Sequence, residues 1–254
     1  MKLVRDTWLI FERSMWLTLH NPVWVVFGLM MPFLYLVLFG PLLESITKTP
    51  GFPGGGNAYN VFVPGLLIQI ALFGGSFVGF GLIAELRAGV VERMQVTPVS
   101  RLAMLLGRSL RDVVILLAQA VFLVVLAIPF GLHIDIPALI VALGLLALIG
   151  LIMAPLSYAL ALMTKNEDAF APMVNAIAMP LLLLSGILLP MQLAPEWLRT
   201  IAAFDPFSHG VDAIRALFNG SFGDPSVVGG VTLTAILAVL SLFAASRAFG
   251  RAVA

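Results

Sequence analysis

The side chains that could do chemistry are few and lie far apart along the chain. The three histidines, His20, His133 and His209, fall in separate segments, so their spacing does not indicate a metal site. Ser185 precedes Gly186, but the pattern that surrounds a nucleophilic serine is absent. The sequence has no cysteine and no G-x-x-x-x-G-K-[ST] motif, which excludes thiolate ligands and ATP binding by that route. We therefore predict no catalytic residue, no metal site and no cofactor bound by this chain.

The composition is that of an integral membrane protein. Hydrophobic residues make up 61% of the 254 positions, charged residues 11%, and the mean hydropathy is +1.07, values far from those of soluble domains. A bilayer core of about 30 Å needs about 20 apolar residues as a helix. Continuously apolar runs, without alternation, exclude a barrel. We predict an all-α membrane protein with six transmembrane helices, at approximately residues 23–43, 62–84, 113–132, 138–163, 169–189 and 227–248.

The basic residues indicate the orientation of these spans. With the N-terminus inside, eleven of the fourteen lysines and arginines fall in cytoplasmic segments, and only Lys48, Arg199 and Arg215 fall outside. Lysine and arginine near span ends resist translocation, so both termini are expected in the cytoplasm. Since the basic residues are distributed by membrane side and do not form one patch, nucleic acid is not an expected partner.

Residues 85–112 form a charged segment between the second and third spans, with five of the fourteen basic residues. Gly89 and the Thr97-Pro98 turn should divide it into short helical pieces, because glycine weakens a helix interior and the residue before proline leaves the α region. The segment is either a helical docking point for a cytosolic partner or a solvated loop.

Residues 1–22 are predicted to form an amphipathic helix at the membrane interface. Leu9 and Trp16 interrupt its polar face, which suggests a protein contact as the alternative to a lipid contact. The polar face consists of Lys2, Arg5, Asp6, Glu12, Arg13 and His20, and the opposite stripe of Val4, Trp8, Phe11, Met15 and Leu19.

Prolines and small residues predict different roles for individual spans. Pro32 in the first span and Pro180 in the fifth should kink their helices, so these spans either line a path or are kinked by ordinary packing. Ala71, Gly75 and Gly79 in the second span allow close helix approach, within the monomer rather than between copies. No span has an ionisable residue in its middle, so energy for uphill transport would come from another subunit.

Residues 190–225 are expected outside, between the fifth and sixth spans. Two helical patterns, at residues 195–204 and 209–218, are separated by Asp205-Pro206 and end at Asn219-Gly220. Their apolar faces are too short to span the bilayer, so we predict short re-entrant helices.

The order of these motifs resembles the permease subunits of type 2 ABC exporters, the class that includes the daunorubicin-resistance permeases of actinobacteria. The stretch E-R-M-Q-V-T-P-V-S-R-x-x-x-L-L-G-R at residues 92–108 is similar to the family's loop between its second and third spans. The six-span layout and the amphipathic N-terminal helix also match, so the resemblance covers the single permease domain of residues 1–254. The last external region matches at Leu189, Pro190, Pro195, Trp197, Leu198, Asp205, Pro206, Asp212, Arg215 and Gly220, where Asp205 replaces the more usual asparagine.

The resemblance implies an export permease of the prokaryotic cell (inner) membrane. Two copies would assemble with two copies of a separate ABC ATPase subunit, which would bind ATP and Mg²⁺. Related permeases export drugs, lipids, glycans and other compounds, so a hydrophobic or amphipathic substrate is expected. The implied site residues are Glu92, Arg93, Thr97, Pro98 and Arg101 for ATPase coupling, Pro32, Leu34, Asn175 and Pro180 for the dimer and translocation path, and Pro195, Trp197, Asp205, Pro206 and Arg215 for the external re-entrant motif.

Two alternatives stand beside this interpretation. A passive membrane channel or scaffold would use the same six spans without nucleotide hydrolysis. An intramembrane enzyme is disfavoured because the chain lacks a catalytic constellation.

Overall fold

The computed structural model describes residues 2–21, 23–47, 58–95, 99–187, 191 and 194–252. Within these ranges every regular element is a helix, as the composition predicted. The helices are α1 (Lys2–His20), α2 (Val23–Thr47), α3 (Ala58–Phe77), α4 (Gly79–Arg87), α5 (Val90–Gln95), α6 (Arg101–Ala127), the 3₁₀ turn η1 (Ile128–Phe130), α7 (Ile136–Thr164), α8 (Glu167–Leu184), α9 (Glu196–Ala202), α10 (Pro206–Phe218) and α11 (Pro225–Ala252).

Five helical segments of the described chain are long and apolar enough to cross a membrane: Ala58–Arg87, Arg101–Phe130, Ile136–Thr164, Glu167–Leu184 and Pro225–Ala248. A sixth results if Lys2–His20 and Val25–Gly40, which meet at 68°, count as one bent span. The predicted windows therefore coincide with helices. The largest difference is the start of the third span, which begins at Arg101 instead of residue 113 because Ser100 caps the helix there, accepting a hydrogen bond from the backbone N–H of Ala103 at 3.1 Å.

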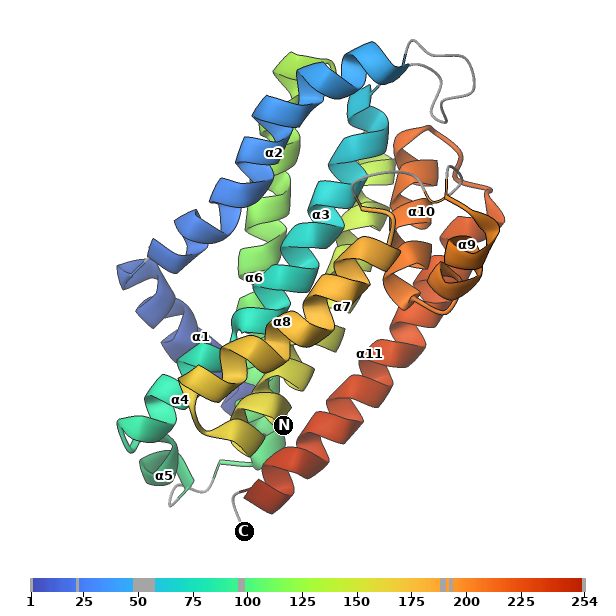
Figure 1. Ribbon diagram of the computed structural model, residues 1–254. Helices are drawn as coiled ribbons and strands as arrows, with labels where there is room; N and C mark the ends of the chain where they lie inside the picture. Colours follow the sequence, from blue (N-terminus) through green and yellow to red (C-terminus); the bar gives the residue numbers. More distant parts are fainter. Residues whose placement is uncertain are drawn as a thin grey trace.

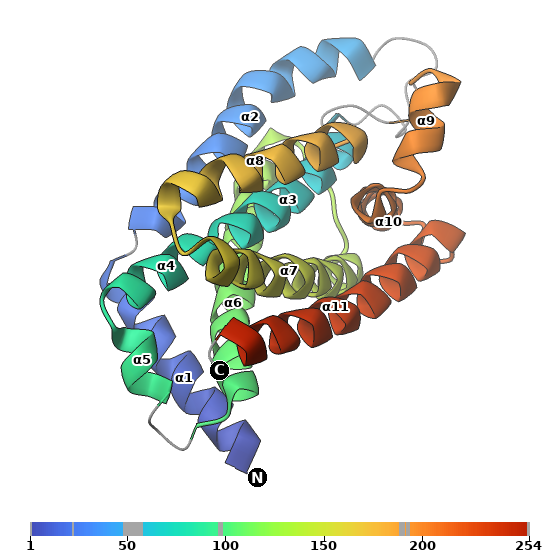
Figure 2. The same ribbon diagram turned by 60° about the horizontal axis from the view of Figure 1, so that its bottom comes forward.

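The bundle has two differently built ends (Figure 1). At the lower end in that view lie α4, α5 and both termini. The opposite end carries α9, α10 and the connection from η1 to α7. Figure 2, turned by 60°, shows α1 and α5 close together at one side of the bundle and α9 and α10 at the other. Because both termini lie at the same end of the bundle, the chain would cross the membrane an even number of times.

The second span, α3 with α4, is the centre of the bundle. It contacts α2, α6, α7, α8 and α10. Its small residues face neighbouring helices of the same chain: a Cβ on Gly75 would lie 2.6 Å from Met153 Cβ, and one on Gly79 would lie 2.5 Å from the Phe170 ring. Packing within the monomer, the interpretation that the sequence favoured for these residues, is confirmed.

The span is broken between Phe77 and Gly79, and a serine on α7 bridges the break. The Ser157 hydroxyl donates a hydrogen bond to the carbonyl of Ser76 at 2.6 Å and accepts one from the Gly79 N–H at 2.9 Å. A hydroxyl of a neighbouring helix also bonds α7, three residues before Pro155. There the Ser241 hydroxyl of α11 donates to the carbonyl of Ile152 at 2.7 Å. Hydroxyls of neighbouring helices thus satisfy carbonyls at irregular turns, as membrane helices require.

The N-terminal helix α1 packs against α6. The contact does not involve Leu9 and Trp16, the residues that suggested a protein contact, because they are 54% and 59% exposed. The buried residues of α1 are Asp6, Ile10 and Ser14, and the closest approach is at Gly107, where a Cβ would lie 2.7 Å from Ile10 Cβ. Asp6 was expected on a water-facing side, but it faces the protein. The predicted apolar stripe instead points away from the bundle, with Val4 and Trp8 exposed. Its contact with the membrane interface stays a prediction.

The packing of α3 against α7 predicts the effect of one added methyl group. Gly75→Ala would force apart helices that touch at Met153, so we expect a loss of about 1 to 3 kcal/mol in stability. The matched control is Gly144→Ala on α7, where a Cβ would meet no atom within 4 Å. Thermal unfolding of the detergent-purified variants checks this. Equal unfolding midpoints for both variants would contradict the packing described.

Candidate functional site

Two arginines of α6 lie inside the bundle near its lower end, and each has an acidic partner. Arg108 Nη2 donates to Glu85 Oε2 of α4 at 2.5 Å, with the Arg108 side chain only 6% exposed. Removing a charge from water is costly unless it is paired and hydrogen-bonded. The pair therefore fixes α4, which continues into the docking segment, to the first turns of α6.

The second arginine belongs to a three-membered cluster. Arg111 Nη2 lies 2.5 Å from Asp112 Oδ1 and donates to the hydroxyl of Tyr158 on α7 at 3.0 Å. The Tyr158 hydroxyl donates in turn to Asp112 Oδ2 at 2.5 Å. Arg111 Nη1 also reaches the hydroxyl of Thr18 on α1 at 3.4 Å. We call these five residues, Glu85, Arg108, Arg111, Asp112 and Tyr158, the buried polar cluster.

The buried polar cluster joins elements that are far apart in the sequence. It connects α4, α6 and α7 directly and reaches α1 through Thr18. Arg13 of α1 also donates to the sulfur of Met94 on α5 at 3.3 Å. An ion pair thus joins α4 to α6, and hydrogen bonds from Arg111 join α6 to α7 and α1, in addition to the apolar contacts. The arrangement can transmit motion but contains no nucleophile–base pair.

Sequence reasoning missed the buried polar cluster. Arg108 and Arg111 were assigned to the cytoplasmic loop, because they precede the apolar run that begins at residue 113. Asp112 and Tyr158 were not considered at all. One signal was available in the Arg-x-x-Arg-Asp pattern at residues 108–112. If the helix starts at Arg101, the three charged residues share one face of an amphipathic helix, and in the structure this face points into the bundle.

The predicted coupling residues lie beside the cluster, not in it. Gly89 breaks the chain between α4 and α5 with a positive φ of 66°, so the predicted division into short helices is confirmed there. Arg93 on α5 and Arg101 at the start of α6 are both exposed. Thr97, Pro98 and the side chain of Glu92 lie outside the described residues. The coupling role of these five residues stays a prediction.

The residues predicted for the path lie on α2 and α8, which the structure places against α3. Leu34 and Asn175 are exposed, and Pro180 is exposed on α8, whereas Pro32 is buried. Asn175 donates to the carbonyl of Ala171 within its own helix at 3.0 Å. The four residues therefore do not form one cluster in a single chain, and their shared role depends on a second copy.

The external motif splits into an exposed and a buried part. Pro195 precedes α9 as its cap instead of entering the first turn, and Trp197 is 65% exposed. Asp205 caps α10 by accepting a hydrogen bond from the Phe207 N–H at 3.0 Å, next to Pro206 in the first helical turn. The predicted stop at Asn219-Gly220 is confirmed. Whether these helices are re-entrant stays a prediction.

Arg215 of α10 was expected as an external loop charge, but it is buried. Its Nε donates to the carbonyl of Val61 on α3 at 3.0 Å, and its Nη2 donates to the carbonyl of Gly186 after α8 at 2.7 Å. Burial lowers the pKa of Arg215 to about 10, while nearby Asp212 opposes the change, so the guanidinium stays charged at neutral pH. Arg215 thus holds the ends of α3 and α8 to α10.

The carboxyl group of Asp205, at the start of the same helix α10, is buried, and only one of its oxygens accepts a hydrogen bond. Its Oδ2 atom has no hydrogen-bond partner. Burial raises the pKa of Asp205 to about 6, although the hydrogen bond from Phe207 and the nearby His209 act in the opposite direction.

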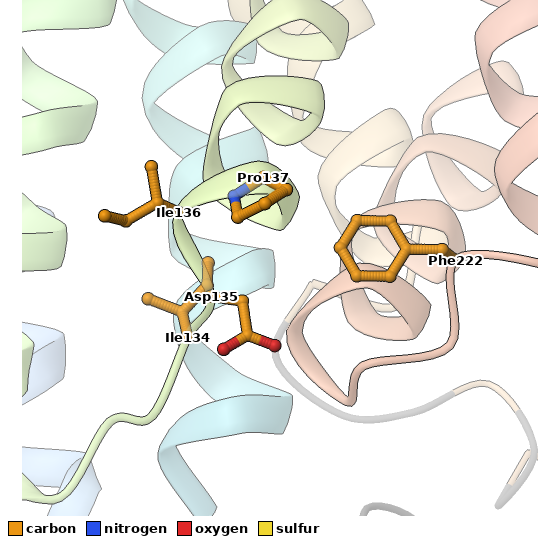
Figure 3. Close-up of a pocket in the computed structure, with 5 residues that line it drawn as sticks. All are labelled: Ile134, Asp135, Ile136, Pro137 and Phe222. Carbon is orange, nitrogen blue, oxygen red and sulfur yellow. The ribbon is translucent and has the colours of Figure 1, made fainter.

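An open depression of about 720 Å³ lies near this end, between the start of α7 and the α10–α11 connection. It is lined by Ile134, Asp135, Ile136, Pro137 and Phe222. Figure 3 shows the rings of Phe222 and Pro137 on opposite sides, with the Asp135 carboxylate below them. A single carboxylate among apolar walls offers no pair of groups for acid–base chemistry. Among the residues that the structure describes, no group of three His, Asp or Glu side chains could hold a metal ion.

The buried pair predicts an asymmetry between single and double substitutions. Glu85→Met leaves the Arg108 guanidinium buried without its partner and should lower stability by about 3 to 5 kcal/mol. The double variant Glu85→Met with Arg108→Met removes both charges and should recover most of that loss. Thermal unfolding in detergent measures both.

A matched control is Arg87→Met, which breaks the exposed pair with Glu167 at 3.1 Å. Exposed pairs contribute at most about 1 kcal/mol, so this variant should stay close to wild type. If the double variant is as unstable as Glu85→Met alone, the loss of stability does not come from leaving Arg108 unpaired.

A second prediction concerns Asp205 and pH. Because the folded-state pKa lies above the ordinary value of 3.8 for an aspartate, the unfolded chain loses this proton first as pH rises, and stability contributed by the group falls between about pH 4 and pH 6. Asp205→Asn keeps the cap on Phe207 and removes the ionisation. We expect it to raise the unfolding temperature at about pH 8 and to change it less at about pH 4. An equal change at both pH values would contradict the buried, titrating carboxyl.

Comparison with known proteins agrees with this layout. The profile of the ABC-2 type transporter family matches residues 5–219. The chain is 27% identical over 238 residues to the daunorubicin resistance ABC transporter permease protein DrrB1 of Streptomyces coeruleorubidus, which covers 91% of this chain and 81% of that protein. It is 25% identical over 222 residues to the putative transport permease ycf38 of Cyanophora paradoxa, with 86% and 76% covered. It is 24% identical over 242 residues to the probable doxorubicin resistance ABC transporter permease protein DrrC of Mycobacterium tuberculosis, with 93% and 85% covered. With most of its length matched and its helices arranged as membrane spans, the chain belongs to the ABC-2 type transporter family.

Proposed function

We propose that this chain is the transmembrane subunit of an ATP-driven exporter. Two copies assemble with two copies of a separate ATPase subunit that binds ATP and Mg²⁺, in the prokaryotic cell (inner) membrane with both termini cytoplasmic. The substrate is a hydrophobic or amphipathic molecule such as a drug, lipid or glycolipid. Membership of the ABC-2 family supports the proposal, and two relatives are named for resistance to daunorubicin and doxorubicin.

The observation that carries the proposal is the position of the buried polar cluster. It lies where α1 and the α4–α5 segment meet the long helices α6 and α7. An ATPase bound to α1 and α5 would move these elements when it closes on nucleotide. The Glu85–Arg108 ion pair would pass that movement from α4 to α6, because breaking a buried pair is costly. The hydrogen bonds of Arg111 would link α6 to α7 and α1.

The absence of charge further along the spans supports an external energy source. Between residues 113 and 132, 138 and 163, and 227 and 246 the sequence has no aspartate, glutamate, lysine, arginine or histidine. Transporters driven by protons or sodium usually bind the ion at buried carboxylates or broken helices near the membrane centre. The energy for uphill export would then come from the partner ATPase.

The exposed faces of α2 and α8 support a second copy of the chain as partner. Large apolar side chains on both helices point away from the bundle, among them Phe27 at 58%, Ile177 at 54% and Leu183 at 65% exposure. Only 17% of the α8 span is buried within one chain. Lipid can cover such faces, but the exposed Asn175 and Pro180 of α8 favour a protein contact or a polar path.

Charge reversal in the docking segment tests ATPase coupling. If Glu92 and Arg101 pair across the contact, loss of one partner costs about 2 to 5 kcal/mol, or at least roughly a thirtyfold loss of affinity. The double variant Glu92→Lys with Arg101→Glu should therefore lose the co-purifying ATPase and ATP-dependent transport together, while permease insertion is unchanged. Arg199→Glu, on exposed α9 at the other end, is the control. Normal assembly and transport in the double variant would favour a passive channel or scaffold.

Cysteine cross-linking tests the dimer. The chain has no native cysteine, so Leu34→Cys or Asn175→Cys can link only to the same position in a second copy. We expect a covalent dimer on mild oxidation in membranes. Gly144→Cys on α7 is the control and should stay monomeric. Linking through Gly144 but not through Leu34 or Asn175 would move the interface away from α2 and α8.

A further inference from the structure

Helix α2 contacts the bundle differently on the two sides of Pro32. The upper part of α2 in Figure 1, residues 32–40, buries three residues at spacings of four: Pro32, Leu36 and Gly40. A Cβ on Gly40 would lie 2.6 Å from the hydroxyl oxygen of Tyr59 on α3. In residues 23–31, no side chain that the structure describes is buried. We call residues 32–40 the upper half and residues 23–31 the lower half of α2.

A buried glutamine of α6 forms the hydrogen bond that reaches the lower half. Gln119 is 7% exposed, and its Nε2 donates to the carbonyl of Val25 at 2.8 Å. Gly28 lies against the same amide, because a Cβ there would be 3.1 Å from Gln119 Nε2. Within the described chain, no other hydrogen bond joins residues 23–31 to a different helix. Since no bulk water replaces the carbonyl inside a membrane span, this bond holds the lower half more than apolar burial does.

The helix is weakened at the point where the two halves meet. Pro32 has no N–H, so it cannot donate to the carbonyl of Gly28 one turn earlier. At the other end of the lower half, α1 meets α2 at an angle of 68°. In Figure 1, α2 lies near the upper part of α3 and diverges from it toward α1. The lower half is therefore an arm between a proline and a bend, and helices change direction most readily at such points.

We infer that Gln119 is a positioning residue for α2. Its hydrogen bond to Val25 holds the lower half against α6. When this bond opens, the lower half turns about Pro32 and away from α6, while the upper half stays packed on α3. Helix α2 is one of the two helices proposed for the path, so the role of Gln119 in transport rests on the proposed function. The contact itself sets the separation between the lower half and α6.

Spin-label distances within the permease test this role. The sequence has no cysteine, so label pairs can be introduced without background. Val239→Cys on α11, across the bundle from α2 in Figure 2, serves as the reference. Phe27→Cys reports the lower half and Leu38→Cys the upper half, and all three positions are exposed. Labelled chains in lipid nanodiscs are diluted with unlabelled chains, so that only distances within one chain are measured.

Gln119→Met keeps the length of the side chain and removes its donor. We expect the lower pair, Phe27 with Val239, to give a longer mean distance and a broader distribution than in the wild type. The upper pair, Leu38 with Val239, should not change, because its packing on α3 is untouched. The matched control is Val121→Met, at an exposed position of the same helix, which should change neither pair.

Gly28→Ala tests the same contact from the side of α2. The added Cβ would lie closer to Gln119 Nε2 than ordinary van der Waals contact, so the amide must shift away. We expect the lower pair to change in the same direction as in Gln119→Met, by a smaller amount. Gly74→Ala on α3, where a Cβ would meet no atom within 4 Å, is the control and should change neither pair.

The inference is overturned if Gln119→Met leaves the lower pair unchanged, even where the assembled complex exports a substrate with ATP and the proposed function stands. It is also overturned if the upper pair broadens as much as the lower pair, or if Val121→Met has the same effect, because the substitution then loosens the whole bundle. None of these distances depends on an ATPase. If Gln119→Met releases only the lower half but the complex exports nothing with ATP, the positioning of α2 by Gln119 stands and the proposed function fails.

Discussion

Two arginines in a membrane helix, Arg108 buried and Arg111 half-buried, constrain the rest of this fold. Arg108 and Arg111 enter the bundle on α6, and each needs acceptors that water cannot supply there. Glu85 supplies one from α4, and Asp112 with Tyr158 supplies the others from α6 and α7. Because the pairs come from three helices, those helices keep a fixed relation at this end. The N-terminal helix then adds Thr18 and packs over Gly107.

At the opposite end of the bundle a buried arginine also joins several helices, but its hydrogen-bond acceptors are backbone carbonyls. Arg215 joins α10 to the ends of α3 and α8 through two carbonyl groups. Gly186 can offer its carbonyl because it adopts a positive φ of 69°. Between the two ends the helices touch mainly through apolar side chains and closely packed glycines, with a few interhelix hydrogen bonds from Ser157 and Ser241. A bundle with both ends cross-linked by charge and a less polar middle suits a transporter whose spans move as rigid elements.

The sequence predicted the features that depend on local chemistry. Apolar length located five helices that are long enough to cross a membrane, and α2, which counts as a sixth span only together with α1. Gly89 and Gly220 ended helices as expected, and the motifs indicated the family. It did not predict which side of α1 faces the protein. Asp6 carries a charge and was assigned to the solvent-facing side, and the close packing of α1 against Gly107 of α6, which buries this side, is a long-range contact. It also misplaced Arg108, Arg111 and Arg215, since hydropathy treats every charge as a loop residue. Pairing with Glu85 or with the Val61 carbonyl is a long-range contact that one sequence does not reveal.

The ratio of transport to ATP hydrolysis in the reconstituted complex tests the central claim most directly. Glu85→Gln and Tyr158→Phe weaken the buried polar cluster and leave the residues predicted for ATPase coupling, such as Arg93 and Arg101, unchanged. The account predicts that ATP hydrolysis continues in both variants while the amount of substrate exported per ATP falls severalfold, and that Arg87→Gln at the exposed pair leaves the ratio unchanged. An unchanged ratio in the cluster variants, with assembly intact, would contradict the claim that this cluster carries movement from the ATPase side into the spans.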